Sequence, residues 1–82
     1  MRQVLTHSAQ LGKIIVDRRR ASRLSQRALA AKLALSQNRW SEIESDAATL
    51  TVGRLLELAN ILGLEIIIQD RQAANRSNDA EW

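Results

Sequence analysis

The chain has 82 residues, of which 45% are hydrophobic, and a formal net charge of +3. This length suits one small domain near the lower limit for a single hydrophobic core, so a partner subunit is expected to add stability. The absence of cysteine excludes disulfide frameworks and thiolate metal sites. The apolar runs are too short for a membrane span or a signal peptide, which predicts a cytoplasmic protein. We expect neither a cofactor nor a small-molecule ligand.

Basic residues are concentrated in the N-terminal half. Between Lys13 and Arg39 there are eight basic residues and one acidic residue, Asp17, whereas eight acidic residues lie from Glu42 onward. Ten of the twelve basic residues are arginine, whose planar guanidinium suits phosphate and guanine. This asymmetry favours polyanion binding by the N-terminal half, and the alternative is a solvated helix face rich in arginine.

Apolar residues at helical spacing predict two helices at the start of the chain. The first runs from Ser8, as its N-cap, to about Ser22, with its arginines on the side away from the core. The second follows Ser25 as its N-cap, and its inward residues are Ala28, Leu29, Ala30 and Leu33.

A third helix, capped by Ser36, is predicted to be polar over most of its surface. On a helical wheel Trp40 and Ile43 share one side, and because so short a helix is not stable alone, these two residues must pack on the preceding helix. The other side chains carry groups that read base edges in the major groove of DNA: Gln37, Asn38, Arg39, Ser41 and Glu42.

Only residues 33–36 separate the second and third helices, so the two must cross steeply, with the small Ala30 at the crossing. This is the helix-turn-helix pattern, in which the second helix of the motif enters the major groove and the first lies across the backbone. Phosphate contacts are expected from the helix N-termini and the basic faces, namely from Arg18, Ser25, Gln26, Arg27, Lys32 and Ser36.

Thr51 is expected to cap a fourth helix that runs through Leu62 and ends at Gly63. Its predicted apolar stripe is Val52, Leu55, Leu56, Ala59 and Leu62.

The segment "LEIIIQ", residues 64–69, is β-branched and alternating, which predicts the only strand of the chain. Because a lone strand has no partner for its backbone, we expect it to pair with the same strand of a second copy across a two-fold axis, through Leu64, Glu65, Ile66, Ile67 and Ile68. The alternative is that the segment continues the helix or packs as an irregular tail. The expected organisation is a helix-turn-helix domain at 1–63, a dimerisation strand at 64–70 and a disordered tail at 71–82.

The stretch "LSQRALAAKLALSQNRWSEIE" resembles the DNA-binding motif of the XRE-type family of phage repressors and Cro proteins. The matching positions are Leu24, Ser25, Gln26, Leu29, Ala30, Ser36, Ser41, Ile43 and Glu44. The resemblance implies an all-α, lambda-repressor-like domain of four to five helices and a structural ion pair between Arg19 and Glu44. Ala34 stands where the family usually has glycine, so a left-handed turn there would cost about 1–2 kcal/mol. Trp40 replaces a β-branched residue, and we expect it in the core.

The C-terminal half, with "LGLEIIIQD" and a polar tail that ends in "EW", resembles HipB-like antitoxins. The resemblance implies a homodimeric repressor that binds an inverted-repeat operator in double-stranded DNA and neutralises a HipA-like Ser/Thr kinase toxin. Trp82 would then be recognised by the toxin or by a protease.

Two other functions are open at this point. One is a stand-alone XRE-family regulator, such as a phage repressor or a restriction-modification controller, and the other is a module whose basic half binds an acidic protein. We expect no enzyme, because the chain has a single histidine, no cysteine and no Gly-rich phosphate loop.

Overall fold

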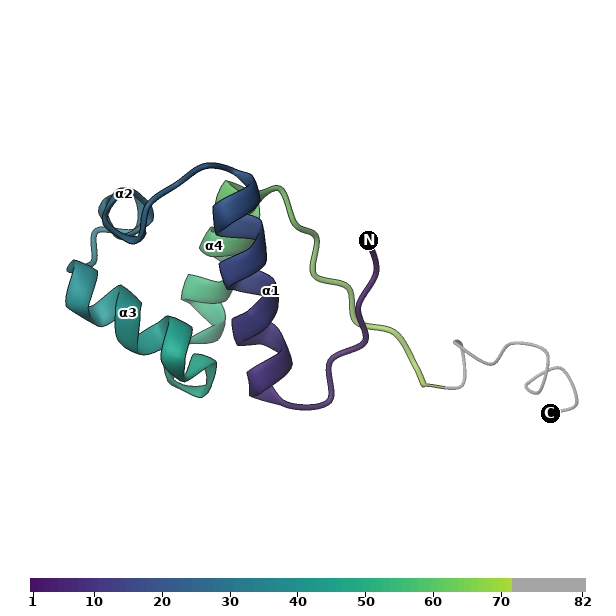
Figure 1. The fold of residues 1–82 in the computed structure, drawn as a ribbon. Helices are drawn as coiled ribbons and strands as arrows, with labels where there is room; N and C mark the ends of the chain where they lie inside the picture. The colour runs from purple at the N-terminus through teal and green to yellow at the C-terminus, as the bar shows by residue number, and fades with distance from the viewer. Residues whose placement is uncertain (72–82) are drawn as a thin grey trace, which may run out of the picture.

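The computed structural model describes residues 1–71, which fold as four α-helices and one short 3-10 helix (Figure 1). In chain order the elements are α1 (Ser8–Ala21), α2 (Gln26–Lys32), α3 (Gln37–Ser45), η1 (Ala47–Thr49) and α4 (Val52–Leu62). Helix α3 packs against both α2 and α1, and η1 also contacts α1 and α3. No helix in residues 1–71 is long and apolar enough to cross a bilayer. The predicted disordered tail, apart from Arg71, and the predicted role of Trp82 lie outside the described residues.

Three of the four predicted N-caps are confirmed. The side-chain oxygens of Ser25, Ser36 and Thr51 each accept a hydrogen bond from the backbone N–H three residues later, at 3.0–3.1 Å. Gly63 ends α4 with a φ of 69°, in the left-handed region where glycine meets no steric penalty. These local signals fix where α2, α3 and α4 begin and where α4 ends.

The N-cap of α1 is His7 and not Ser8, which is the first residue of the helix. The side-chain oxygen of Gln10 accepts hydrogen bonds from the backbone N–H groups of Thr6, at 2.7 Å, and His7, at 3.4 Å. Because Gln10 binds the backbone in front of the helix, the chain enters α1 one residue before the predicted position.

The core lies between the helices and is built around the fully buried Trp40. The predicted apolar stripe of α4 is wrong in two positions, because Val52 is 73% exposed and Leu56 is 50% exposed. Ala59 and Leu62 of the predicted stripe are buried, and Leu58, which was not predicted, is buried beside them. The side of α4 that these three residues define leaves Val52 and Leu56 exposed to solvent. The buried core cluster is Ile15, Leu29, Ala30, Leu33, Trp40, Ile43, Leu58 and Leu62.

The segment after Gly63 leads away from the helices and is neither helix nor strand (Figure 1). Leu64 packs against the core and its N–H donates to the carbonyl of Ala59 at 2.8 Å. Beyond it the chain exposes Ile67 and Ile68, at 67% and 97%. The helix therefore does not continue past Gly63, and the pairing of residues 64–70 with a second copy stays a prediction.

Candidate nucleic-acid interface

The turn between α2 and α3 has the left-handed conformation that glycine usually supplies. Ala34 adopts a φ of 57°, and the N–H of Leu35 donates to the carbonyl of Ala30 at 2.9 Å, which closes the turn. The alanine thus keeps the turn geometry at a cost of about 1–2 kcal/mol. This turn sets the angle at which α3 leaves α2.

Helix α3 has one buried side and one polar exposed side. Trp40 and Ile43 are 0% and 1% exposed, which confirms the expected core position of Trp40. The side chains on the remaining surface face solvent at Gln37, Asn38, Ser41 and Glu42. The structure therefore presents four of the five predicted base-reading residues on one exposed helix surface.

The fifth predicted base reader, Arg39, is held at the edge of this surface. Its Nη2 donates to the carbonyl of Thr49 at 3.1 Å, and its Nη1 donates to the hydroxyl of Thr49 at 3.4 Å. The sequence does not reveal this partner, because Thr49 lies beyond the end of α3 and reaches Arg39 only through the turn that η1 forms.

Glu44 joins three helices through its carboxylate. Arg19 donates from Nε to Oε2 at 2.6 Å and from Nη2 to Oε1 at 3.3 Å. Gln26 donates from Nε2 to Oε1 at 2.8 Å, and Trp40 donates from Nε1 to Oε2 at 2.7 Å. The ion pair that the resemblance implied is thus present. The two further donors were not predicted, although Trp40 and Glu44 stand at the i and i+4 spacing of a helix.

The protonation of Glu44 depends on these donors. Burial alone would raise the pKa of the carboxyl, because it disfavours the charged form. The hydrogen bonds from Arg19, Gln26 and Trp40, together with the charge of Arg19, act in the opposite direction and hold the pKa below its usual value. Glu44 is therefore a charged structural group and not an exposed DNA-binding residue.

Two of the predicted phosphate-binding residues are engaged inside the protein. The Nη2 of Arg18 donates to the carbonyl of Leu62 at 2.9 Å, at the C-terminal end of α4. Gln26 uses its side-chain N–H on the carboxylate of Glu44. The structure leaves four predicted phosphate-binding residues exposed, at Ser25, Arg27, Lys32 and Ser36.

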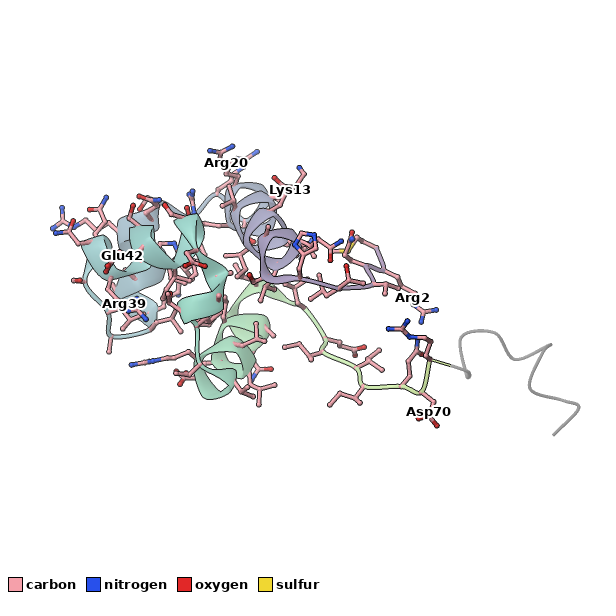
Figure 2. All side chains as sticks on the ribbon, turned by 90° about the horizontal axis from the view of Figure 1, so that it is seen from below. Arg2, Lys13, Arg20, Arg39, Glu42 and Asp70 are labelled. Carbon is pink, nitrogen blue, oxygen red and sulfur yellow. The ribbon has the colours of Figure 1, made fainter. Side chains whose placement is uncertain are left out.

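The exposed surface of α3 and the segment 64–70 lie at opposite ends of the molecule. Figure 2 shows Arg39 and Glu42 at one end and Asp70 at the other, with Arg2 on the same side as Asp70. A partner bound to residues 64–70 would therefore leave the surface of α3 accessible. No group of three or more histidine, cysteine, aspartate or glutamate side chains within residues 1–71 is arranged to hold a metal ion.

Comparison with known proteins agrees with this geometry. A family model described as a helix-turn-helix domain matches residues 10–67, which include all four helices of the structure except the first two residues of α1. No curated protein matches the chain. Because the family model covers more than half of the chain, and because the turn at Ala34 and the exposed surface of α3 stand where the motif requires them, the chain belongs to the helix-turn-helix domain family.

Proposed function

We propose that this chain is a sequence-specific DNA-binding transcriptional repressor that places α3 in the major groove. The observation that carries the proposal is the exposed polar surface of α3 on a helix whose other side is fixed by the buried Trp40 and Ile43. Amide, hydroxyl and carboxylate groups on such a helix can discriminate base pairs by their donor and acceptor patterns. The proposed base readers are Gln37, Asn38, Ser41 and Glu42.

Exposed cations next to this surface support the same function. Arg27 and Lys32 lie on α2, the helix that crosses the DNA backbone in this type of motif. Each phosphate that a cation neutralises releases condensed counterions, which strengthens binding at low salt and makes the affinity depend on salt concentration. We propose that these two residues, with the backbone at Ser25 and Ser36, hold the phosphates.

Selection of duplexes from a random library, followed by fluorescence anisotropy on the selected sequence, tests this function. Asn38→Ala should lower the affinity by about 1–3 kcal/mol and relax the preference at one base pair, because the variant has no amide to bind a base edge. Asn60→Ala is the matched control, since Asn60 is exposed on α4. If the wild-type protein enriched no sequence, or if both variants bound like the wild type, α3 would not be the reading helix.

We further propose that the repressor acts as a homodimer joined by residues 64–70. The exposed Ile66, Ile67 and Ile68 support this, because a short apolar segment with free backbone groups is stabilised by pairing with a second copy. A dimer of this kind would place two copies of α3 on an operator with two-fold symmetry.

The finer proposal is that the repressor is an antitoxin that neutralises a HipA-like Ser/Thr kinase. Its support is the resemblance of the C-terminal half, "LGLEIIIQD" with a terminal "EW", to HipB-like antitoxins. A pull-down from native extract with an N-terminal tag, after nuclease treatment, should retain the kinase with the wild type and lose it with Trp82→Ala. If the protein bound DNA but retained no kinase, it would instead be a stand-alone XRE-family regulator.

A further inference from the structure

The guanidinium of Arg39 is anchored to a single residue outside α3. Both of its terminal nitrogens donate hydrogen bonds to Thr49, Nη2 to the carbonyl and Nη1 to the hydroxyl. The hydroxyl of Thr49 donates its own proton to the carbonyl of Asp46 at 2.9 Å. Because that proton is already used, the hydroxyl oxygen faces Arg39 as an acceptor.

From this arrangement we propose that Thr49 is a positioning residue that fixes Arg39 for binding to a DNA phosphate at the edge of the major groove. The proposal rests on the proposed function, since it requires α3 to lie in that groove. It assigns Arg39 a different task from the base reading that the sequence predicted.

The place of Arg39 on the helix favours phosphate over base. Asn38 and Glu42 lie opposite the buried Trp40 and Ile43 on the helical wheel, whereas Arg39 lies on the flank. A helix with its side chains is about 10–12 Å wide and the major groove is about 12 Å wide, so the flanks of the helix face the two phosphate backbones. The hydrogen bonds to Thr49 hold the guanidinium on this flank, away from the bases that the outward side chains face.

The guanidinium retains donors for an anion while it is bound to Thr49. Arginine has five N–H groups, and the two hydrogen bonds to Thr49 leave others free. A long side chain that is already held in one place loses less rotamer freedom when it meets DNA. Thr49 therefore contributes to affinity without touching the DNA itself.

A double-mutant cycle tests the coupling between the two residues. The affinities of the wild type, Arg39→Ala, Thr49→Val and the double variant are measured on the duplex selected with the wild type and on a scrambled duplex, over a range of salt concentrations. Thr49→Val removes the hydroxyl and keeps the shape, and Thr49→Ser keeps the hydroxyl. Thr6→Val is the matched control, because Thr6 is exposed in the segment before α1.

We expect Thr49→Val to weaken binding about twofold to tenfold, because it removes one of the two acceptors that hold the guanidinium of Arg39 and leaves the carbonyl of Thr49 in place. Thr49→Ser and Thr6→Val should change the affinity little. Arg39→Ala should weaken binding to both duplexes by the same factor and reduce the slope of log affinity against log salt by about 0.9 for each phosphate that Arg39 neutralises. Thr49→Val should have almost no further effect once Arg39 is absent. Circular dichroism at each salt concentration verifies that all variants are folded.

Two results would overturn the positioning role. One is full additivity of Arg39→Ala and Thr49→Val, which would show that Thr49 acts independently of Arg39. The other is an effect of Arg39→Ala that is confined to one base pair of the selected duplex, which would make Arg39 a base reader. If the wild-type protein preferred no duplex, the proposed function itself would be refuted as well. This failure is distinguished from failure of the positioning role because it is observed with the wild-type protein alone.

Discussion

Arg19 on α1 and Glu44 at the end of α3 form an ion pair in which both side chains are nearly buried, at 10% and 8% exposure. The carboxylate also accepts hydrogen bonds from Gln26, the first residue of α2, and from the indole of Trp40. One side chain thereby fixes α1, α2 and α3 relative to each other. The angle at which α3 is presented depends on this carboxylate as well as on the turn at Ala34.

This ion pair predicts a loss of stability in acid. Because the folded protein lowers the pKa of Glu44, the charged carboxylate contributes its full stabilisation above the ordinary glutamate pKa of about 4.3. The contribution disappears as the pH falls from that value through the lower pKa of the folded state. Urea unfolding measured between pH 7 and pH 3 should therefore show a decline in the free energy of unfolding that starts near about pH 4–5.

Glu44→Gln is the variant that isolates this contribution. It should lower the free energy of unfolding at pH 7 by about 3–5 kcal/mol, because it leaves the guanidinium of Arg19 buried without its counter-ion. Its stability should also change less with pH in acid than that of the wild type. Parallel pH profiles for the two proteins would show that other carboxyl groups cause the acid sensitivity.

Ala34→Gly is expected to stabilise the protein. Ala34 has a φ of 57°, where a side chain costs about 1–2 kcal/mol, and glycine loses about 0.5–1 kcal/mol of that gain through its freer unfolded chain. The net expectation is a gain of about 0.5–1 kcal/mol in the free energy of unfolding, measured by thermal or urea unfolding. Ala31→Gly, at an exposed position inside α2, should instead destabilise the protein by about 0.5–1 kcal/mol. Equal effects of the two substitutions would contradict the role of the left-handed conformation.

Arg18 and Arg27 are expected to separate stability from DNA binding. Arg18→Ala removes the hydrogen bond to the carbonyl of Leu62 and a cation at the C-terminal end of α4, which should cost about 1–2 kcal/mol of stability. Arg27→Ala, at an exposed position, should leave stability unchanged. It should reduce the slope of log affinity for DNA against log salt by about 0.9, the value for one phosphate contact. Thermal unfolding measures the first effect, and DNA titrations at several salt concentrations measure the second. If folded Arg18→Ala also reduced the slope of log affinity against log salt, Arg18 would bind a phosphate after all.

The features that could be predicted from the sequence are those with local causes. Ser25, Ser36 and Thr51 cap helices because their side chains reach an N–H only three residues away, and the buried position of Trp40 follows from its spacing to Ile43 on one short helix. These signals are sufficient to place the helix-turn-helix motif and the polar surface of α3.

The features that could not be predicted depend on interactions between distant residues. Arg18 reaches a carbonyl 44 residues away, so its position on α1 is equally typical of a phosphate-binding arginine. The predicted buried side of α4 is wrong at Val52 and Leu56 for a related reason. Apolar residues occupy most of the circumference of the helix, so the pattern alone does not single out one side. Tertiary packing decides between such alternatives.

Ile68→Lys is expected to weaken the proposed dimer. Ile68 is 97% exposed in the single chain, and burying an isoleucine side chain is worth about 1.5–3 kcal/mol. A symmetric dimer contains the residue twice, so the dissociation constant should rise by about 100-fold or more, which sedimentation equilibrium measures directly. Val52→Lys is the matched control, because Val52 is 73% exposed on α4 and has no part in the proposed pairing. If Ile68→Lys dimerised like the wild type while Val52→Lys did not, the interface would lie on α4 and the pairing of residues 64–70 would be wrong.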